Sequence, residues 1–547
     1  MPTAHTDTFT ADHLPPKDQW PELLFEGPEL QALADRPQLN CAAELLDVAV
    51  QKGWGDRPCI VSDTSCWTYA ELLEHSNRVA QVLVQDMGLV PGNRVLLRSP
   101  NTPMMAACWF GVVKAGGVAV PTMPLLRARE LRVIIDTAQI SHALCDAGLA
   151  EELRTAQAGS VLHQVRWITG DTAAQTSGAA ASASLEWAMA QHSGPFSAVP
   201  TAATDTAFLA FTSGTTGVPK ATMHFHRDVM AACLCWPRHT LRAQADDVFI
   251  GSPPLAFTFG LGGLLLFPLH IGASTVLLPQ ASPPLLLEGI QRHGATVVFT
   301  SPTSYRAMAA RGQELRSSRL RHCVSAGEAL PAATRELWAS ATGLGMIDGI
   351  GSTELLHIFI SARAQDAVPG ATGQVVPGYR ARVVDEQGQE VPDGTVGRLA
   401  VRGPTGCRYL ADERQRQYVQ HGWNLTGDAY RRDAQGHFHY VSRTDDMIVS
   451  SGYNIGAPEV EDALMSHPAV AECGVIGVPD EERGQIVKAF VVLRPDHPPS
   501  EQTLQALQDH VKATIAPYKY PRAIRFVPGL PRTETGKLQR FRLRDLP

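Results

Sequence analysis

The sequence has no excess of basic residues. Its 547 residues contain 47 Lys and Arg against 54 Asp and Glu, so the formal net charge is −7 at pH 7 with histidine neutral. Proteins that bind nucleic acids need a concentrated basic surface. The charge balance therefore argues against nucleic acid as a partner and favours small molecules.

Clustered cysteines are also missing. The ten cysteines are scattered, and the closest two, Cys233 and Cys235, lack the second pair that a zinc site needs. We expect reduced, mostly buried thiols. Two pairs of histidines have alternate spacing: His224 with His226, and His437 with His439. Neither pair has a third candidate ligand, which favours structural roles.

Neither a secretory leader nor an uninterrupted membrane span is recognisable. The start, "MPTAHTDTFTADHLPP", has no basic n-region and no apolar h-region, which predicts a cytoplasmic protein. The stretch 255–278 has no Asp, Glu, Lys or Arg, yet several glycines, Pro268 and His270 interrupt it. We therefore expect a buried core segment there and no membrane partner.

From Gly88 onward, short apolar runs alternate with longer helical patterns. Strands are expected at 93–99, 117–122 and 142–146, and helices at 103–116 and 129–140. This alternation predicts a mostly parallel sheet with helices on both faces, in which ligands bind at the carboxyl ends of the strands.

The pattern changes after Gly370, where short strands alternate with turns such as "EQGQ" and "PDGT". We assign a small β subdomain to about 370–445. The last hundred residues read as one compact α+β unit. The sequence therefore predicts an α/β protein with a large N-terminal domain at 1–445, which includes the β subdomain, and a small C-terminal domain at 446–547.

A loop of small and hydroxylated residues, "TSGTTGVPK" at 212–220, follows the apolar run "AFLAF". Gly214 and Gly217 let backbone N–H groups converge on an anion, and Lys220 adds a positive charge. Four residues add hydroxyl donors: Thr212, Ser213, Thr215 and Thr216. The spacing does not match the G-x-x-x-x-G-K-[ST] P-loop. The loop predicts a polyphosphate cradle, with a flexible surface loop as the alternative.

Five motifs, in order, resemble those of the acyl-adenylate-forming superfamily of acyl-CoA synthetases, adenylation domains and luciferases. They are "FTSGTTGVPKA" (211–221, phosphate loop), "GIGSTE" (349–354, second nucleotide motif), "GWNLTGD" (422–428, ribose motif), "SRTDD" (442–446, hinge) and "PRTETGKLQR" (531–540, catalytic-lysine loop). The resemblance covers nearly the whole chain. It implies an acyl-CoA synthetase-like fold whose C-terminal domain moves about a hinge at Asp445.

Three further segments, "TAHTDTF", "ATMHFHRD" and "STELLHIFIS", resemble the benzoate-CoA and 2-aminobenzoate-CoA ligase branch. This resemblance implies that a carboxylate attacks the α-phosphate of ATP, that pyrophosphate leaves, and that the thiol of coenzyme A then displaces AMP. It also implies that Glu354 helps to hold Mg²⁺, that Thr353 contacts the α-phosphate, and that Lys537 bridges the carboxylate and the phosphate.

The same resemblance assigns Asp428 to the ribose hydroxyls, with Arg443 assisting, and Gly452 to the passage of pantetheine. The adenine is expected against two segments, which supply Gly327, Glu328 and Ala329, and Asp348, Gly349, Ile350 and Gly351. Taken singly, Glu354, Asp428 and Lys537 could be a helix-start carboxylate, a turn residue and a surface lysine. Their order within the five motifs favours the functional interpretation.

By resemblance, the acid pocket is lined by Phe257, Thr258, Phe259, Ile350 and His357. An aromatic acid suits such a lining. Because an apolar pocket separates acids that differ by one small group by only about 1–3 kcal/mol, benzoate and monosubstituted benzoates could all react. A hydrogen bond from His357 or Thr258 to an ortho amino group favours 2-aminobenzoate.

Two alternatives to a CoA ligase stay open: a stand-alone adenylation enzyme that charges a carrier protein, and a nucleotide-binding pseudoenzyme. The chain shows no carrier domain, and the presence of Glu354, Asp428 and Lys537 together argues against a pseudoenzyme. The oligomeric state is open, with a homodimer as one possibility.

Overall fold

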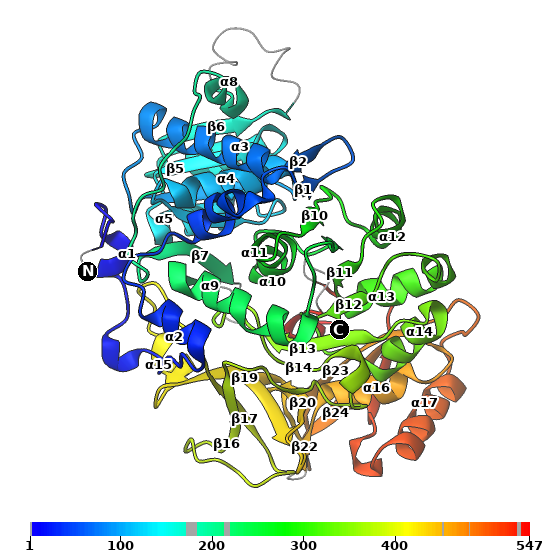
Figure 1. Cartoon of the computed structure of the whole chain (residues 1–547). Coiled ribbons are helices and arrows are strands. Elements are labelled where there is room, and N and C mark those ends of the chain that lie inside the picture. Colours follow the sequence, from blue (N-terminus) through cyan, green and yellow to red (C-terminus); the bar gives the residue numbers. More distant parts are fainter. Residues whose placement is uncertain are drawn as a thin grey trace.

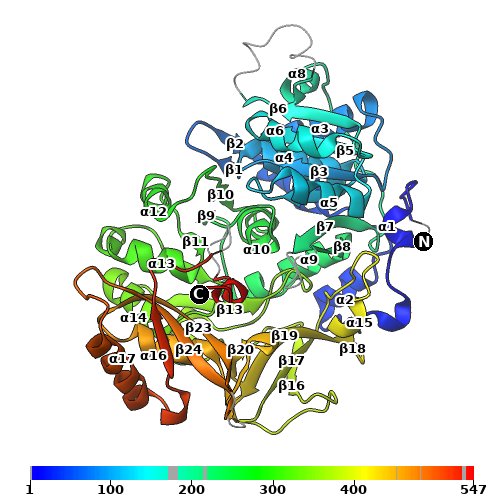
Figure 2. The same ribbon diagram turned by 180° about the vertical axis from the view of Figure 1, so that it is seen from behind.

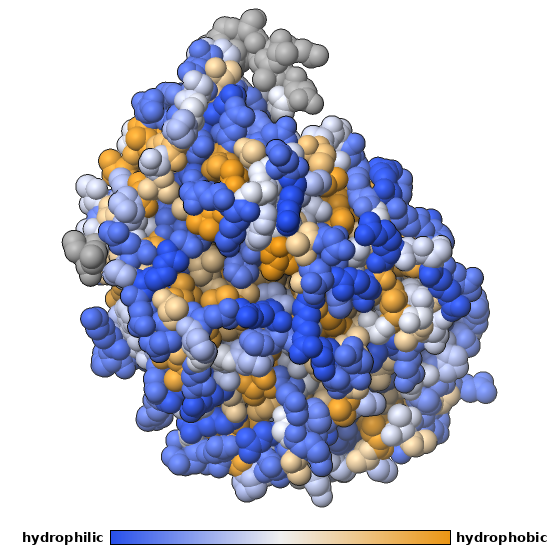
Figure 3. Space-filling view, in the orientation of Figure 1, coloured by the Kyte–Doolittle hydropathy of each residue, from blue (hydrophilic) through white to orange (hydrophobic). Residues whose placement is uncertain are grey.

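The computed structural model describes residues 3–170, 183–212, 219–450, 453–480, 482–532 and 538–546, without the side chains of Asp445 and Asn454. In Figures 1 and 2 a six-stranded sheet lies at the top and a nine-stranded sheet below it, and smaller sheets form the bottom of the molecule. The face in Figure 3 is mostly hydrophilic, with small hydrophobic patches between polar side chains. Two short helices, α1 (Phe9–Asp12) and α2 (Pro28–Ala34), begin the chain.

The six-stranded sheet has the order β6-β5-β3-β4-β7-β8, and its strands pair in parallel except for β8. Its strands are β3 (Arg94–Arg98), β4 (Val118–Thr122), β5 (His142–Asp146), β6 (Gln164–Ile168), β7 (Thr206–Thr212) and β8 (Lys220–Phe225). The helices beside it are α3 (Tyr69–Gln81), α4 (Pro103–Lys114), α5 (Ala128–Ala138), α6 (Ala150–Gln157), α8 (Leu185–Met189) and α9 (His226–Leu234).

Alternate residues of β3 show why both faces of this sheet are apolar. Val95 and Leu97 join the core that contains residues of α3 and α4, whereas Leu96 joins the core that contains residues of α5 and α6. Successive side chains of a strand point to opposite faces, so a sheet covered by helices on both sides needs a continuous apolar run. The strands and helices expected at 93–146 are thereby confirmed.

The nine-stranded sheet has the order β15-β14-β13-β12-β11-β9-β10-β1-β2. Its strands are β1 (Pro58–Val61), β2 (Cys66–Thr68), β9 (Val248–Gly251), β10 (Ser274–Val276), β11 (Val297–Thr300), β12 (His322–Ser325), β13 (Met346–Gly351), β14 (Ile358–Ser361) and β15 (Gln374–Val375). The central pairs are parallel, and antiparallel strands close both edges. Its longer helices are α12 (Pro283–Arg292), α13 (Pro302–Ala309) and α14 (Ala332–Thr342).

The charge-free stretch 255–278 folds into short buried elements, as expected. These are α10 (Thr258–Leu261), the π-helical turn η8 (Gly262–Leu266), α11 (Phe267–His270) and β10. No helix in the described part of the chain is long and apolar enough to cross a membrane.

The β subdomain and the C-terminal unit complete the molecule (Figure 2). The subdomain sheet contains β16 (Arg380–Val384), β17 (Val396–Arg402), β18 (Val419–Gln420), β19 (Trp423–Arg432) and β20 (Phe438–Arg443), with α15 (Gln415–Tyr418) before β18. The C-terminal unit contains β21 (Ile448–Ser450), β22 (Tyr453–Ile455), α16 (Ala457–Met465), β23 (Val470–Asp480), β24 (Gly484–Leu493), α17 (Glu501–Thr514), β25 (Ala523–Phe526) and α18 (Arg540–Leu543).

The C-terminal unit has its own apolar core, in which Val460 and Leu464 of α16 pack with Val475 and Val487 of its sheet. The α/β fold class, with a large N-terminal part and a smaller C-terminal part, is confirmed. The exact boundary between residues 445 and 446 stays a prediction.

Candidate active site

The predicted phosphate loop lies in the sequence between β7 and β8, two strands that Figure 2 labels. Thr212 and Lys220 pair across this antiparallel hairpin, so both ends of the loop are fixed by the sheet. The other loop candidates lie outside the described residues: Ser213, Gly214, Thr215, Thr216 and Gly217. The Thr212 Oγ1 atom is buried and has no hydrogen-bond partner within the described part of the chain.

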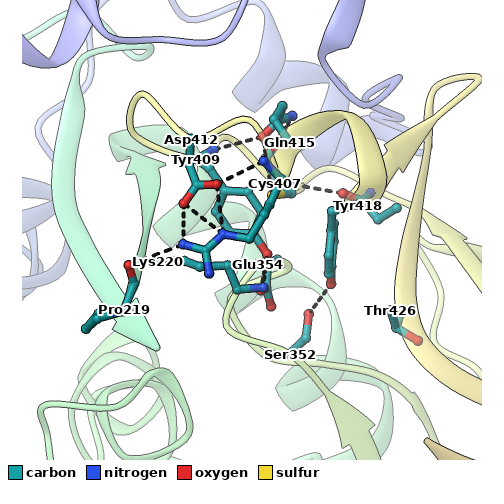
Figure 4. Close-up of polar contacts among 12 residues, drawn as sticks. Pro219, Lys220, Ser352, Glu354, Cys407, Tyr409, Asp412, Gln415, Tyr418 and Thr426 are labelled. Atoms are coloured by element: carbon teal, nitrogen blue, oxygen red, sulfur yellow. Dashed lines mark hydrogen bonds and ion pairs between the residues drawn. The ribbon is translucent and has the colours of Figure 1, made fainter. Parts of the chain in front are cut away.

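Lys220, Tyr409 and Glu354 point toward one another (Figure 4). The Lys220 Nζ donates to Tyr409 Oη at 2.8 Å, and Tyr409 Oη donates to Glu354 Oε1 at 2.5 Å. Lys220 Nζ lies 3.6 Å from the same carboxylate oxygen. Burial raises the pKa of Tyr409 and the charge of Glu354 adds to it, so the hydroxyl stays protonated. The loop lysine and the candidate metal carboxylate therefore share one hydroxyl group.

Tyr409 reaches this place because its segment pairs with β8. Met223 N donates to Arg408 O at 2.8 Å, and Leu410 N donates to Ala221 O at 2.9 Å. The neighbouring Arg408 forms an ion pair with Asp228, and both side chains are fully buried. The sequence analysis missed Tyr409, because "CRYL" has no local feature that distinguishes it from an ordinary strand.

Thr353 and Glu354 lie on the turn between β13 and β14. Ser352 Oγ accepts a hydrogen bond from Leu355 N at 3.2 Å and contacts Tyr418 Oη at 3.2 Å (Figure 4). Thr353 is half-buried and Glu354 is buried. The turn therefore holds the Glu354 carboxylate under the phosphate-loop hairpin.

The ribose candidates face each other on two strands of the β subdomain. Asp428 of β19 pairs with Arg443 of β20, and Arg443 Nη1 lies 3.1 Å from Asp428 Oδ1. Burial raises the pKa of Asp428, and the Arg443 charge opposes that shift. A Cβ at Gly427 would lie 2.6 Å from Arg443 Nη2, so the guanidinium packs where only glycine leaves room.

The adenine candidates lie at the carboxyl ends of two adjacent parallel strands: one group follows β12, and the other forms the end of β13. Ser325 of β12 pairs with Asp348 of β13. Gly327 has a φ of +91°, and burial raises the pKa of Asp348 to about 7. The remaining candidates lie on the same two segments: Glu328, Ala329, Gly349, Ile350 and Gly351.

Two tyrosines, the partly buried Tyr418 and the buried Tyr430, lie among these groups. Burial raises the pKa of Tyr418, and the charges of Glu354 and Asp428 both add to the shift. Burial likewise raises the pKa of Tyr430, with contributions from Asp428 and Asp348. The charges of Glu354, Asp428 and Asp348, one from each of the three candidate motifs, thus all act on this pair of tyrosines, and Ser352 of the Glu354 turn contacts Tyr418 directly.

Two of the acid-pocket candidates, Phe259 and His357, belong to an aromatic cluster that also contains Phe267. The ring centroid of His357 lies 5.7 Å from that of Phe259 and 4.5 Å from that of Phe267. Burial lowers the pKa of His357 to about 3, with the Phe259 backbone opposing the shift. Neither ring nitrogen makes a hydrogen bond of normal geometry to a described residue. His357 is therefore a neutral, polar group in buried, largely aromatic surroundings.

Phe257 and Thr258 begin α10, directly after a loop that Asn101 holds. Asn101 Nδ2 donates to Pro253 O at 3.0 Å, and Asn101 Oδ1 accepts from Leu255 N at 2.8 Å. Phe257 is half-buried and Thr258 is buried. Asn101 is a second residue that the sequence analysis missed, because its contacts lie some 150 residues away.

Lys537 lies outside the described residues together with 533–536, as do Gly452 and the side chain of Asp445. The flanks of 533–537 are placed: Arg532 and Leu538 form an antiparallel bridge. Arg540 lies close enough to Tyr440 of β20 to oppose the pKa rise that burial and Asp428 cause there. The segment after Lys537 thus lies near the ribose candidates.

No group of three or more His, Cys, Asp and Glu that could hold a metal ion occurs in the described segments. His224 stacks on Phe208, and His439 pairs with Asp433 at 2.8 Å, which fits the structural roles expected for the paired histidines. All ten cysteines are free thiols, and eight of them are buried.

Comparisons with known proteins give the same assignment as the motifs. A family model described as AMP-binding enzyme matches residues 47–409, and one described as AMP-binding enzyme C-terminal domain matches residues 459–537. A benzoate–CoA ligase of Thauera aromatica is 36% identical over 512 residues, which cover 92% of this chain and 96% of the relative.

Two solved structures extend this similarity to the fold. The anthranilate CoA ligase AuaEII in complex with anthranoyl-AMP has a TM-score of 0.88 at 34% identity, with 94% of this chain and 98% of that chain covered. A benzoate CoA ligase from Burkholderia xenovorans LB400 has a TM-score of 0.83 at 32% identity, with 92% of this chain and 99% of that chain covered.

The chain belongs to the family of AMP-binding, adenylate-forming enzymes. Within that family it falls in the benzoate-CoA and 2-aminobenzoate-CoA ligase branch, which confirms the resemblance seen in the motifs.

Proposed function

We propose that the protein is an ATP-dependent, cytoplasmic aryl-CoA ligase that acts on an aromatic carboxylate of the 2-aminobenzoate or benzoate type. The observation that carries this proposal is that Glu354, which lies 3.6 Å from Lys220, shares the turn after β13 with His357 of the aromatic cluster. The relatives are CoA ligases, so they do not favour a carrier-protein adenylating enzyme or a pseudoenzyme.

In the first step, a carboxylate oxygen of the acid forms a bond to the α-phosphorus of ATP. The bond between the α-phosphorus and the oxygen that bridges it to the β-phosphorus breaks. The product is the acyl-adenylate, and pyrophosphate leaves. Two anions approach each other in this step, so positive charge fixed in advance lowers the barrier. Lys220, with the rest of loop 212–220, binds the β- and γ-phosphates, Thr353 contacts the α-phosphate, and Lys537 bridges the two reacting groups.

The nucleotide is oriented by the residues that surround Tyr418 and Tyr430. Asp428 accepts hydrogen bonds from the ribose hydroxyls, and Arg443 fixes its carboxylate. The segments 327–329 and 348–351 lie against the adenine, as the resemblance implies.

One buried carboxylate beside a phosphate loop fits Mg²⁺, which binds through one or two carboxylates plus substrate phosphates. Glu354 is the residue that would hold the ion. When bound, Mg²⁺ would neutralise charge on the phosphates.

In the second step, the sulfur of coenzyme A loses its proton and forms a bond to the acyl carbon, and AMP leaves with the bonding electrons of the acyl C–O bond. The lysine loop must withdraw to admit the thiol, so we propose rotation of residues 446–547 about Asp445. Gly452 then allows the pantetheine to pass close to the backbone.

The chemistry of His357 supports 2-aminobenzoate as the preferred acid. A neutral imidazole has one acceptor nitrogen, which could accept a hydrogen bond from an ortho amino group. Benzoate leaves that buried nitrogen unpaired, and an unpaired buried polar group costs free energy. Thr258 is the second candidate partner of the amino group.

The test is a panel of benzoate, 2-aminobenzoate and 2-hydroxybenzoate with ATP, Mg²⁺ and either coenzyme A or a carrier protein. We expect AMP release with coenzyme A and the highest kcat/KM for 2-aminobenzoate. In His357→Leu, this preference over benzoate should fall about tenfold. A clear benzoate preference in the unmodified protein would remove 2-aminobenzoate, and AMP release only with a carrier protein would overturn the ligase.

A further inference from the structure

The Tyr409 hydroxyl stands between the two charged groups of the phosphate site (Figure 4). It accepts from Lys220 Nζ at 2.8 Å and donates to Glu354 Oε1 at 2.5 Å. Lys220 Nζ is 3.6 Å from that oxygen, longer than the ~2.7–2.9 Å of a direct charge-assisted hydrogen bond. The ammonium and the carboxylate are therefore bridged by the hydroxyl and do not form a close ion pair.

Tyr409 is held rigidly enough to keep this separation. Its segment pairs with β8, the strand that begins at Lys220. Its ring packs edge to face against Tyr418, with centroids 5.7 Å apart at 70°. The residue before it, Arg408, forms a buried ion pair with Asp228. The hydroxyl is thus positioned by the sheet and by its neighbours, and does not depend on a bound nucleotide.

The bridge also engages only one of the two carboxylate oxygens of Glu354. The contacts of Tyr409 and Lys220 both fall on Oε1, and Oε2 makes no hydrogen bond or ion pair with any residue that the structure describes. A carboxylate that is held through one oxygen can offer the other to a cation. Without the hydroxyl, Lys220 could move onto the carboxylate and neutralise it, which would also withdraw the ammonium from the phosphates.

We propose that Tyr409 is a positioning residue that keeps Lys220 apart from Glu354, so that the carboxylate stays available to Mg²⁺ and the ammonium to phosphate. This inference rests on the proposed function, because both groups serve ATP there. Tyr409 does not itself touch the reacting atoms.

The test compares Tyr409→Phe with Tyr379→Phe. Tyr379 is buried, and its hydroxyl contacts Thr405 Oγ1 at 2.9 Å, so its variant loses one buried hydroxyl without touching Lys220 or Glu354. Calorimetry measures ATP binding with and without Mg²⁺, in the absence of any acid, and melting temperature checks folding.

We expect Mg²⁺ to strengthen ATP binding in the unmodified protein and in Tyr379→Phe. In Tyr409→Phe the gain from Mg²⁺ should fall about tenfold, the usual effect of losing a hydrogen bond to a charged group. Saturating Mg²⁺ should restore the KM for ATP in acid-dependent turnover. An undiminished gain in Tyr409→Phe would overturn the role of Tyr409 and leave the ligase intact, whereas no ATP binding by the unmodified protein would overturn both.

Lys220→Met decides the question if Tyr409→Phe does not fold. This variant removes the cation that the hydroxyl keeps away from Glu354. ATP binding without Mg²⁺ should weaken, because a phosphate ligand is lost, but the gain from Mg²⁺ should persist. Loss of that gain in Lys220→Met would contradict the proposal.

Discussion

At the scale of single residues, Gly427 leaves room for the arginine that contacts Asp428, the candidate ribose residue. Its φ is +76°, and a Cβ would lie 2.6 Å from the Arg443 guanidinium that contacts Asp428. Gly343 has a similar φ of +79° but open space around it. Alanine at Gly343 would therefore introduce backbone strain alone, whereas alanine at Gly427 would introduce the same strain and a clash with Arg443.

We expect Gly427→Ala and Gly343→Ala to lose similar stability, about 1 kcal/mol or more, because both place a Cβ at positive φ. Only Gly427→Ala should raise the KM for ATP, by displacing Arg443 from Asp428. Thermal melts and ATP titrations measure the two effects. Equal KM values for ATP in both variants would count against the ribose role of Asp428.

Single residues also mark the limit of what the sequence could predict. Lys220, Glu354 and Asp428 were predicted because each belongs to a motif. Tyr409 was not, because its role depends on pairing with a strand that lies almost 190 residues earlier. Such a partner has no local signature, since spacing rules apply within one helix or strand.

At the scale of elements, the periodicity of apolar residues predicted β3, β4 and β5 and helices α4 and α5 within a few residues. It did not predict that residues 255–278 form two short helices around a π-helical turn. The reason is that this segment is apolar all round, so no amphipathic face distinguishes helix from strand.

The π-helical turn η8 gives an element-scale prediction. A Cβ at Gly262 would lie 2.5 Å from His357 Cδ2, whereas one at Gly55 would make only ordinary contacts at 3.7 Å. Gly262→Ala should therefore displace His357, lower stability by about 1–3 kcal/mol and raise the KM for the acid more than that for ATP. Gly55→Ala is the control and should change neither KM. Steady-state kinetics with each substrate varied would refute this if the acid KM stayed the same.

At the scale of the whole molecule, the site is assembled from parts that lie far apart in the sequence. The hairpin of β7 and β8, the turn after β13 and the strands β19 and β20 come from three different sheets. The order of these parts along the chain could be predicted from the motifs. That they lie near Tyr418 and Tyr430 could be learned only from the structure.

The C-terminal unit has a separate core, so it could rotate as a body once the adenylate has formed. Under the proposed mechanism, Lys537 acts only in the first step, the formation of the adenylate. A variant without this lysine should therefore lose one step and keep the other, which a purely structural role for the loop would not produce.

The most direct measurement identifies the products of each step by mass spectrometry. The unmodified protein is mixed with ATP, Mg²⁺ and 2-aminobenzoate, and coenzyme A is added only afterwards. We expect bound 2-aminobenzoyl-AMP and pyrophosphate first, then the thioester and AMP. Lys537→Ala should form the adenylate at least about 100-fold more slowly, yet should convert presynthesised adenylate to thioester almost normally. Release of ADP and phosphate, or equal loss of both steps in Lys537→Ala, would contradict this mechanism.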